Sequence, residues 1–237
     1  MRTQVLLYGI LASVLIYTSL HSPSLFSNRF LKNAGRVPAA ENATYEAITG
    51  QSADEDRSVW DTFYQHKNFV FGKDPVSFLK DYLHRVPVGK AFVPAMGEGR
   101  NAIYLAKNGF QVDGNDLSEV AVDRALSEAR DEKVTFKPIV ADLTQYPLAP
   151  DAYDFVLVSL FYKPSLVDAF KKTVKKGGYI MLYLRIQDDS RFDRISPDDF
   201  AVKPAEVKNA FKDFKTVVYR EYTDHGIPVL GLLAQKP

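Results

Sequence analysis

Two closely spaced glycines, Gly97 and Gly99, are the residues whose spacing points most directly to chemistry. They follow a short apolar run and precede an amphipathic stretch from Asn101 to Lys107. Glycine lacks the Cβ atom that keeps a ligand away from the backbone, and N–H groups at a helix start have no partner within the helix. A strand, a glycine turn and a helix in this order are typical of a nucleoside cofactor site, so we expect both glycines to contact a cofactor.

Acidic residues follow the second and third predicted strands. Asp116-Leu117 ends one strand and Asp142-Leu143 ends the next. The carboxyl ends of parallel strands form the binding edge of an α/β sheet, so both pairs are candidates for cofactor contacts. We expect Asp116 to accept hydrogen bonds from ribose hydroxyls, with Leu117 beside it. Asp142 can accept from the adenine amino group while Leu143 packs on the ring. A helix cap or a turn is the alternative role for both acids.

The glycine turn alone does not choose the cofactor. Gly97 to Ala102 fits the dinucleotide fingerprint G-x-G-x-x-G/A, and Asp116 follows near the distance at which an acid contacts a ribose. This pattern leaves open an oxidoreductase that uses a nicotinamide cofactor. The choice depends on the elements that follow the turn.

The rest of the chain alternates between apolar and amphipathic stretches. Right-handed crossovers between successive strands place helices on both faces of a parallel sheet. We therefore predict an α/β fold with a doubly wound, mostly parallel seven-stranded sheet and a C-terminal antiparallel hairpin. The predicted strands lie near residues 91–95, 111–116, 135–141, 153–160, 178–185, 216–223 and 228–235, with helices near 101–107, 119–130 and 203–211.

The order of these motifs resembles the class I S-adenosylmethionine-dependent methyltransferases, closest to the tellurite-resistance-like small-molecule branch. The matching motifs read GEGRNAIYLAKNGFQVDGNDLS, ADL, YDFVLVS and KKGGYIMLY, and the resemblance covers most of the chain from residue 55 onward. It implies a Rossmann-like methyltransferase fold, S-adenosyl-L-methionine as the cofactor, and Ser159 at the cofactor edge. It also implies a small-molecule methyl acceptor, for which a thiol, a chalcogen oxyanion or a phenol-like compound is suitable.

Two upstream segments add to this resemblance. Val59 to Tyr64 and Phe69 to Pro75 look like the W-D-x-x-Y and Y-G-x-x-P elements that precede the core in that branch. There such elements help to close over the cofactor, so we expect these residues to form a lid. A surface helix followed by a turn is the alternative interpretation.

The end of the first strand departs from the family pattern. Val93 and Ala95 stand where many class I methyltransferases carry an acid and a glycine, and Pro94 between them removes a ladder donor. We therefore expect an irregular strand end. Recognition of the cofactor's ammonium then falls to a backbone carbonyl or, through water, to Glu98. These departures leave open a non-catalytic S-adenosylmethionine-binding module tethered to a membrane.

The candidate catalytic residues are Tyr162 and His225. Tyr162 follows the fourth strand, where the acceptor enters in the family, and His225 stands in the final hairpin. Either can serve as a general base for an oxygen or amine acceptor. A core aromatic and a plain turn residue are the respective alternatives. Nucleic-acid enzymes of the family commonly carry two prolines after the fourth strand, and their absence after Ser159 argues against a nucleic-acid substrate.

Composition narrows the function further. Lysine plus arginine number 30 and aspartate plus glutamate 29, a net charge of +1, so no basic surface for nucleic acid is indicated. The chain has no cysteine, which excludes disulfides, a cysteine nucleophile and a thiolate metal site. The histidines show no metal-ligand spacing, and we expect no metal cofactor. The sequence does not indicate an oligomeric state.

The amino-terminal region is a separate unit. Val5 to Leu20 is almost wholly apolar and, at about 16 residues, near the lower limit for spanning a bilayer. We predict a hydrophobic signal or anchor segment at 1–21, a linker at 22–56 and a methyltransferase domain at 57–237. The cleavage context is poor, which favours an uncleaved anchor over a cleaved signal that exports the protein. Three basic residues after the run favour a membrane-anchored body that faces the cytoplasm: Arg29, Lys32 and Arg36.

Overall fold

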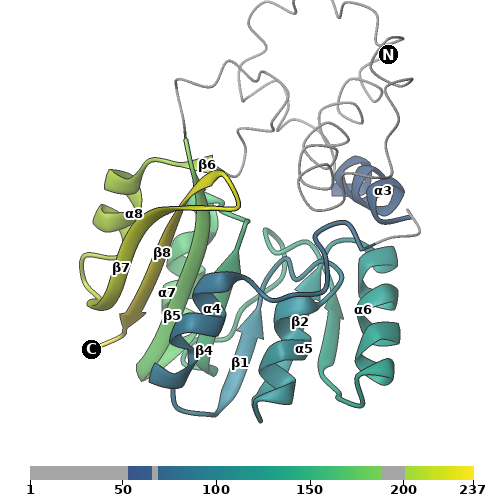
Figure 1. The fold of residues 1–237 in the computed structure, drawn as a ribbon, viewed down its shortest axis with the longest axis horizontal. Helices are drawn as coiled ribbons and strands as arrows, with labels where there is room; N and C mark the ends of the chain where they lie inside the picture. The colour runs from purple at the N-terminus through teal and green to yellow at the C-terminus, as the bar shows by residue number, and fades with distance from the viewer. Residues whose placement is uncertain (1–52, 66–68, 188–200) are drawn as a thin grey trace, which may run out of the picture.

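The computed structural model describes residues 53–65, 69–187 and 201–237. One sheet of eight strands runs through this part of the chain, with helices on both of its faces (Figure 1). The strands are β1 (Lys90–Val93), β2 (Gln111–Asp116), β3 (Lys137–Val140), β4 (Tyr153–Ser159), β5 (Val174–Ile186), β6 (Ala201–Val202), β7 (Lys215–Asp224) and β8 (Ile227–Gln235). The α-helices are α3 (Ala53–Tyr64), α4 (Ser77–Tyr82), α5 (Arg100–Lys107), α6 (Glu119–Asp131), α7 (Val167–Thr173) and α8 (Pro204–Ala210), and short 3₁₀ turns are η1 (Leu83–Arg85) and η2 (Pro164–Leu166).

The strand order is β3-β2-β1-β4-β5-β8-β7, and the short β6 pairs with the end of β5. β1 to β6 run parallel to their neighbours in this set, whereas β8 is antiparallel to both β5 and β7. The predicted α/β fold, a mostly parallel sheet with a terminal antiparallel hairpin, is confirmed, and all seven predicted strands are present. β6 escapes prediction because two residues are too few to show the alternation of a strand.

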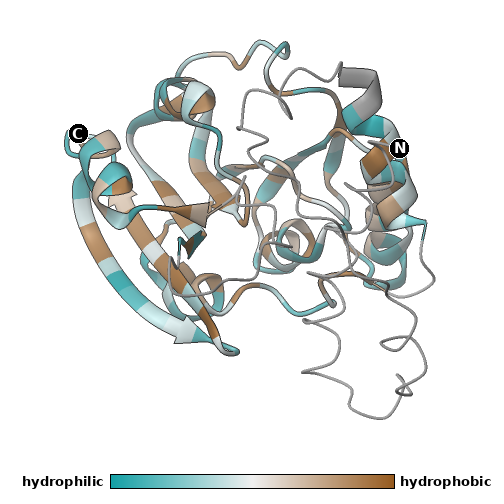
Figure 2. Cartoon of the chain, turned by 90° about the horizontal axis from the view of Figure 1, so that it is seen from above, coloured by the Kyte–Doolittle hydropathy of each residue, from teal (hydrophilic) through white to brown (hydrophobic). Residues whose placement is uncertain are grey.

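Two hydrophobic cores lie on the two faces of the sheet. α4, α5 and α6 cover one face, where Leu79, Leu105 and Val122 are buried with Phe155 of β4. α7 and α8 cover the other face, where Phe170 is buried. Figure 2 shows apolar stretches along the strands between these layers. Because both faces are covered, the central strands read as nearly continuous apolar runs, which is why the sequence predicts them well.

β1 ends at Val93, earlier than predicted. Pro94 follows the strand and Ala95 adopts a positive φ of 45°, so the chain leaves the ladder here. The Met96 N–H then donates to Asn115 O at 2.7 Å, which returns the chain to the end of β2. The irregular strand end is confirmed, and its cause is the amide donor that proline lacks.

A two-residue turn, His225 and Gly226, joins β7 to β8. Both residues adopt positive φ, 48° and 79°, as a type I′ hairpin turn requires. Asp224 and Ile227 pair across the turn. Because β8 runs antiparallel to β5, the turn lies at the carboxyl ends of the parallel strands.

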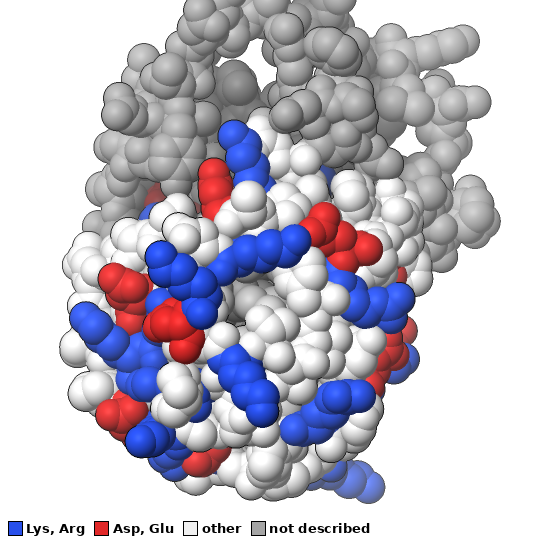
Figure 3. Space-filling view, turned by 90° about the vertical axis from the view of Figure 1, so that its left-hand side faces the viewer, with Lys and Arg blue, Asp and Glu red and all other residues white. Residues whose placement is uncertain are grey.

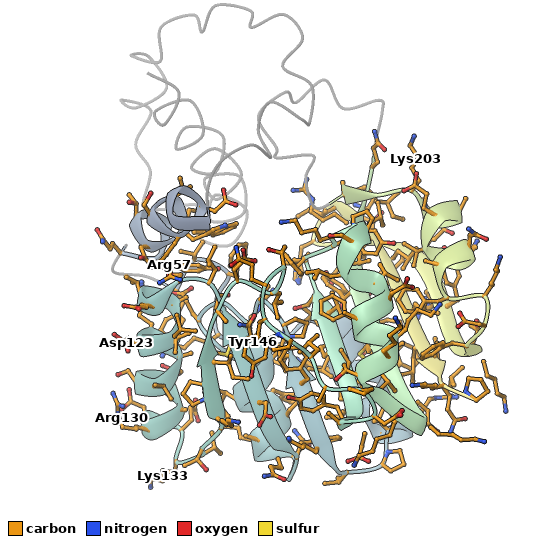
Figure 4. All side chains as sticks on the ribbon, turned by 180° about the vertical axis from the view of Figure 1, so that it is seen from behind. Arg57, Asp123, Arg130, Lys133, Tyr146 and Lys203 are labelled. Atoms are coloured by element: carbon orange, nitrogen blue, oxygen red, sulfur yellow. The ribbon has the colours of Figure 1, made fainter. Side chains whose placement is uncertain are left out.

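Charged residues cover the outside of the helices. Figure 4 shows Asp123 and Arg130 of α6 pointing away from the sheet. On the side formed by α8 and β7, lysine and arginine are interspersed with aspartate and glutamate (Figure 3). Among the described helices none combines the length and the apolar character that a membrane span needs. Val5 to Leu20, the predicted signal or anchor, lies outside the described residues.

Candidate functional site

The carboxyl ends of the parallel strands form the candidate binding edge. The chain passes from β1 to β2 on one side and returns to β4 on the other, so the strand order reverses between β1 and β4. In open α/β sheets, ligands bind in the crevice that such a reversal opens. The glycine turn follows β1 directly and Ser159 ends β4, which brings both to this point.

Gly97 and Gly99 both adopt positive φ, 56° and 83°, which other residues rarely tolerate. A Cβ atom on Gly97 would lie 2.9 Å from Tyr64 Oη, and one on Gly99 would lie 2.7 Å from Ala125 Cβ. The two glycines therefore let α3 and α6 pack closely against the turn. Helix packing is thus one reason for glycine at both positions, and the predicted contact with a ligand stays a prediction.

Asp116, at the end of β2, is buried, with 7% of its surface exposed. Its carboxylate accepts from the Gly97 N–H at 2.8 Å and from the Ser118 N–H at 3.0 Å. Burial raises the pKa of Asp116, although these hydrogen bonds act in the opposite direction. An ionised carboxylate offers about four acceptor positions, so capacity remains for the predicted ribose hydroxyls. Leu117 lies next to it and is partly buried.

Helices α5 and α6 begin differently. Ser118 caps α6, its Oγ accepting from the Ala121 N–H at 3.1 Å. α5 begins after Gly99, and no side chain caps it. The helix-cap role considered for Asp116 thus belongs to Ser118. The uncapped start of α5 can bind an oxygen of a ligand through its first-turn N–H groups.

Glu98 lies between the two glycines and faces the lid, a name that we give to α3 and residues 69–75, which include the two predicted lid segments 59–64 and 69–75. Its carboxylate accepts from the Val70 N–H at 2.7 Å and pairs with Arg124 Nε at 3.0 Å. Burial raises the pKa of Glu98, and the contacts with Val70 and Arg124 partly offset that rise. Glu98 therefore holds the lid and α6 together, which differs from the water-mediated contact with a cofactor ammonium that the sequence suggested.

Two arginines fasten the lid to the binding edge. Arg124 Nη1 donates to Tyr64 O at 2.6 Å, and its guanidinium lies 5.1 Å from the centroid of the Phe69 ring. Arg100 Nη1 donates to Phe71 O, also at 2.6 Å. In the sequence Arg100 looks like a solvated residue at a helix start, because its partner comes from the preceding lid rather than from α5.

α3 docks across the start of α6. Val59 and Phe63 are buried in a small core with Ala121 of α6. Asp61 Oδ1 accepts from Ser118 Oγ at 2.5 Å, which adds a polar contact to the same junction. Figure 1 shows α3 at the carboxyl-end side of the sheet. The position of α3 is compatible with a lid, and its closure over a cofactor stays a prediction.

Asn101, in the first turn of α5, joins the residue before α4 to the end of β4. Its Oδ1 accepts from the Val76 N–H at 3.0 Å, and its Nδ2 donates to Ser159 Oγ at 2.9 Å. Asn101 is buried, with 3% of its surface exposed. Ser159 is thereby held beside the start of α5. Asn101 is not among the predicted site residues, because neither of its partners is near it in the chain.

Asp142 shapes the turn after β3. Its two carboxylate oxygens accept from the N–H and the Oγ1 of Thr144, both at 2.8 Å. This is the turn alternative that the sequence left open. Leu143 is buried in the core on the α7 and α8 face. The adenine contacts of both residues stay predictions.

The two predicted catalytic residues lie in different surroundings. Tyr162 packs partly buried against the core on the α7 and α8 face. Burial, followed by the charge of Glu206, raises the pKa of Tyr162. His225 is exposed in the β7–β8 turn, with its Nε2 3.5 Å from Asp224 Oδ1. The two residues therefore belong to different parts of the edge.

Hydroxyl groups surround Asp224, a residue that the sequence analysis did not select. Asp224 Oδ2 accepts from Ser77 Oγ at 2.5 Å and from Tyr183 Oη at 2.7 Å. Tyr222 Oη lies 3.1 Å from Ser77 Oγ. Burial by itself raises the pKa of Asp224, but the hydrogen bonds from Ser77 and Tyr183 hold it below its usual value. We call these four residues the Asp224 cluster.

Neither a metal-ligand group nor the surface hollow beside α8 is part of the predicted site within the described residues. The described ranges contain no group of histidine, aspartate and glutamate side chains that could hold a metal ion. A surface hollow of about 320 Å³ lies between α8 and β7, and none of the predicted site residues line it. The candidate site residues therefore lie at the carboxyl ends of the parallel strands and not at this hollow.

Comparisons with known proteins identify similar sequences. A family model described as tellurite resistance protein TehB matches residues 61–226. Hemagglutinin 1 from Eikenella corrodens is 24% identical over 179 residues, which cover 68% of this chain and 59% of that protein. Ribosomal protein L11 methyltransferase from Campylobacter concisus is 33% identical over 131 residues, 53% of this chain and 44% of that protein. The chain thus spans about half the length of the curated relatives it matches.

Solved structures share the fold. TehB from Haemophilus influenzae superposes with a TM-score of 0.60 at 20% identity, covering 76% of this chain and 67% of that one. Other matching structures are described as S-adenosylmethionine-dependent methyltransferases. At these identities the likeness concerns the architecture.

Proposed function

Because this chain belongs to the tellurite resistance protein TehB family, we propose that it transfers a methyl group from S-adenosyl-L-methionine to a small-molecule acceptor. The observation that carries this proposal is the hydrogen bond from the Gly97 N–H to the Asp116 carboxylate, near the point where the strand order reverses. A fixed carboxylate beside an uncapped helix start suits a nucleoside with ribose hydroxyls.

The residues at the edge fit this cofactor. Asp116 keeps acceptor capacity for the ribose, while α5 offers N–H groups next to Gly97 and Gly99. In our proposal Asp142 and Leu143 contact the adenine, and Ser159 lies near the transferred group. Val93 has no charge to offer the cofactor's ammonium, so a backbone carbonyl of the 94–97 stretch takes that role.

The bound cofactor supplies a methyl group on a positively charged sulfur, which is already a strong electrophile. The task of the chain is then to place the acceptor in line with that methyl group and to exclude water. The lid serves the second purpose, since α3 and residues 69–75 are fastened over the glycine turn by Arg100 and Arg124.

Calorimetric titration tests the cofactor. We expect S-adenosylmethionine and its demethylated product to bind, and NAD to give no heat beyond dilution. NAD binding without a response to either sulfur compound would exclude the methyltransferase proposal and favour the oxidoreductase interpretation.

A panel of acceptors tests the transfer. A thiol, selenite, tellurite and a phenol are incubated with the chain and labelled cofactor, and methylated products are counted. Transfer to any of them supports an enzyme. Cofactor binding without transfer would instead favour a non-catalytic binding module.

The location of the chain is a separate proposal that rests on the sequence alone. We propose that Val5 to Leu20 stays attached and holds the body at the cytoplasmic face of a membrane. Protease treatment of sealed vesicles and an intact-mass measurement test it. A mature chain that begins near residue 22 to 40 would refute it.

A further inference from the structure

The Asp224 cluster combines residues from three separate elements at one point. Ser77 begins α4, Tyr183 comes from β5, and Asp224 ends β7. Asp224 is 13% exposed at its side chain, whereas the neighbouring His225 is 62% exposed. A mostly buried carboxylate thus lies 3.5 Å from the Nε2 atom of an imidazole that reaches solvent, and attraction between the two can orient the imidazole once it is protonated.

The cluster adjoins the proposed cofactor site. Tyr183 pairs in register with Ser159 across β5 and β4, and neighbouring strands lie about 4.8 Å apart. Ser77 follows Val76, whose N–H donates to Asn101 at the start of α5. Two independent connections therefore place Asp224 beside the end of β4, on the side away from Asp116.

Several charged and titratable groups face the cluster. Arg100 of α5 lies close enough to influence Asp224, and Asp81 of α4 influences Tyr222. Burial, followed by the hydrogen bond to Asp224, raises the pKa of Tyr183, so this tyrosine stays protonated and donates. The anionic member of the cluster is therefore Asp224.

We propose that the Asp224 cluster forms the acceptor wall of the site, and that it selects a neutral molecule with an ionisable hydroxyl group, such as a phenol. Asp224 is a positioning residue that orients His225, and His225 removes the acceptor's proton. This inference rests on the proposed methyltransferase function and names its substrate class. A chalcogen oxyanion is disfavoured because the carboxylate repels a second negative charge.

The transfer step balances without a further reactant. A lone pair of the acceptor oxygen forms the new C–O bond with the methyl carbon, while the C–S bond breaks and its electron pair stays on sulfur. The acceptor's O–H proton passes to a ring nitrogen of His225 and then to solvent. The products are a methyl ether and the neutral, demethylated cofactor.

The test compares two phenols that differ in protonation. At mildly alkaline pH, 4-nitrophenol is largely ionised, whereas 4-methylphenol keeps its proton. With the full chain and S-adenosylmethionine, His225→Gln should lower kcat/KM for 4-methylphenol about 100-fold, the usual size of a general-base effect. The same variant should leave 4-nitrophenol nearly unaffected, because that acceptor needs no base.

The Asp224→Asn variant shows whether Asp224 acts by orienting His225 or only by stabilising the fold. It should also lower the rate with 4-methylphenol but not with 4-nitrophenol, since it removes the support of His225 together with the repulsion of an anion. Asp151→Asn is the matched control, because Asp151 is likewise an aspartate with a side-chain partner, Lys236 at 3.0 Å, but lies away from the site. It should change neither rate.

Equal losses with both phenols would overturn the inference, because a structural defect does not distinguish acceptors. Transfer to selenite or tellurite in preference to both phenols would overturn the proposed acceptor class, as would cofactor binding with no transfer to any of the four. A wild-type chain that does not bind S-adenosylmethionine by calorimetry would instead refute the proposed function itself.

Discussion

The glycine-loop side of the binding edge comprises residues 97–99, Asp116 and the lid. There the carboxylates of Glu98 and Asp116 are buried, and their hydrogen bonds come mainly from backbone amides. On the hairpin side, which comprises the Asp224 cluster and His225, the carboxylate is bonded to hydroxyl groups and reaches solvent through the histidine. Backbone amides are fixed by the strands and helices that carry them. Hydroxyl partners depend on individual side chains.

Point substitutions therefore change the hydrogen-bond donors on the hairpin side more easily than the backbone donors on the glycine-loop side. Replacing Ser77 or Tyr183 alters the polar wall and leaves the strand ladder intact, because neither hydrogen bond belongs to the ladder. Changing the glycine turn disturbs the packing of two helices at once. One scaffold can therefore keep its cofactor while its acceptor changes.

Substitution of a glycine on each side gives the largest expected contrast. Gly99→Ala should destabilise the chain by about 3 kcal/mol, because positive φ and a close contact with Ala125 both oppose a methyl group. Gly226→Ala should cost only about 1 kcal/mol, since its added Cβ meets nothing within 4 Å. Urea unfolding measures both values. Similar losses at the two positions would show that packing does not distinguish the sides.

Removing a carboxylate should affect the cofactor on one side only. Asp116→Ala should weaken binding of the demethylated cofactor by roughly 1.5–3 kcal/mol, about 10- to 150-fold, because charge-assisted hydrogen bonds are lost. Asp224→Ala should leave this affinity unchanged. Calorimetry at matched ionic strength makes the comparison, and an equal loss in Asp224→Ala would place the cofactor nearer the hairpin than we propose.

The ion pair that holds the lid should have a smaller effect. Glu98→Gln keeps an acceptor for the Val70 N–H but removes the charge opposite Arg124. We expect a loss of about 1 kcal/mol in the free energy of unfolding. Limited proteolysis of the segment formed by α3 and residues 69–75 should become faster in the same variant. An unchanged cleavage rate would show that this pair does not hold the lid.

The dependence of stability on pH should have opposite signs on the two sides. The pKa of Asp224 is lowered, so its stabilising contribution is present above the ordinary value of 3.8 and is lost as pH falls through the folded-state pKa. The pKa of Asp116 is raised, so its contribution is present below 3.8 and is lost as pH rises through the folded-state pKa. Urea unfolding of Asp224→Asn and Asp116→Asn across acidic pH measures both trends; parallel trends would contradict the assignment.

The fold was largely predictable because it depends on local patterns. Apolar runs such as Tyr153 to Ser159 specify buried parallel strands, and Asp224 to Ile227 specifies a tight hairpin. Pro94 correctly indicated an irregular end of β1. The short α4 was not predicted, since six residues show less than two turns of periodicity.

The site was predictable only where its residues follow strands in order. Asp116 and Ser159 lie at the expected strand ends. The roles of Glu98, Arg100 and Asn101 depend on partners from distant parts of the chain, which a single sequence does not pair with them. Asp224 looked like an ordinary turn residue for the same reason.

Asn101 stands two residues after Gly99, next to the glycine-loop side, and it contacts Ser159, which pairs with Tyr183, and Val76, the neighbour of Ser77 on the hairpin side. A ligand that shifts this amide on either side changes the free energy of the other side as well. Such a coupling free energy is reciprocal: by whatever factor the cofactor changes acceptor affinity, the acceptor changes cofactor affinity equally. In our proposal, occupancy of the two subsites is therefore linked through a single buried side chain.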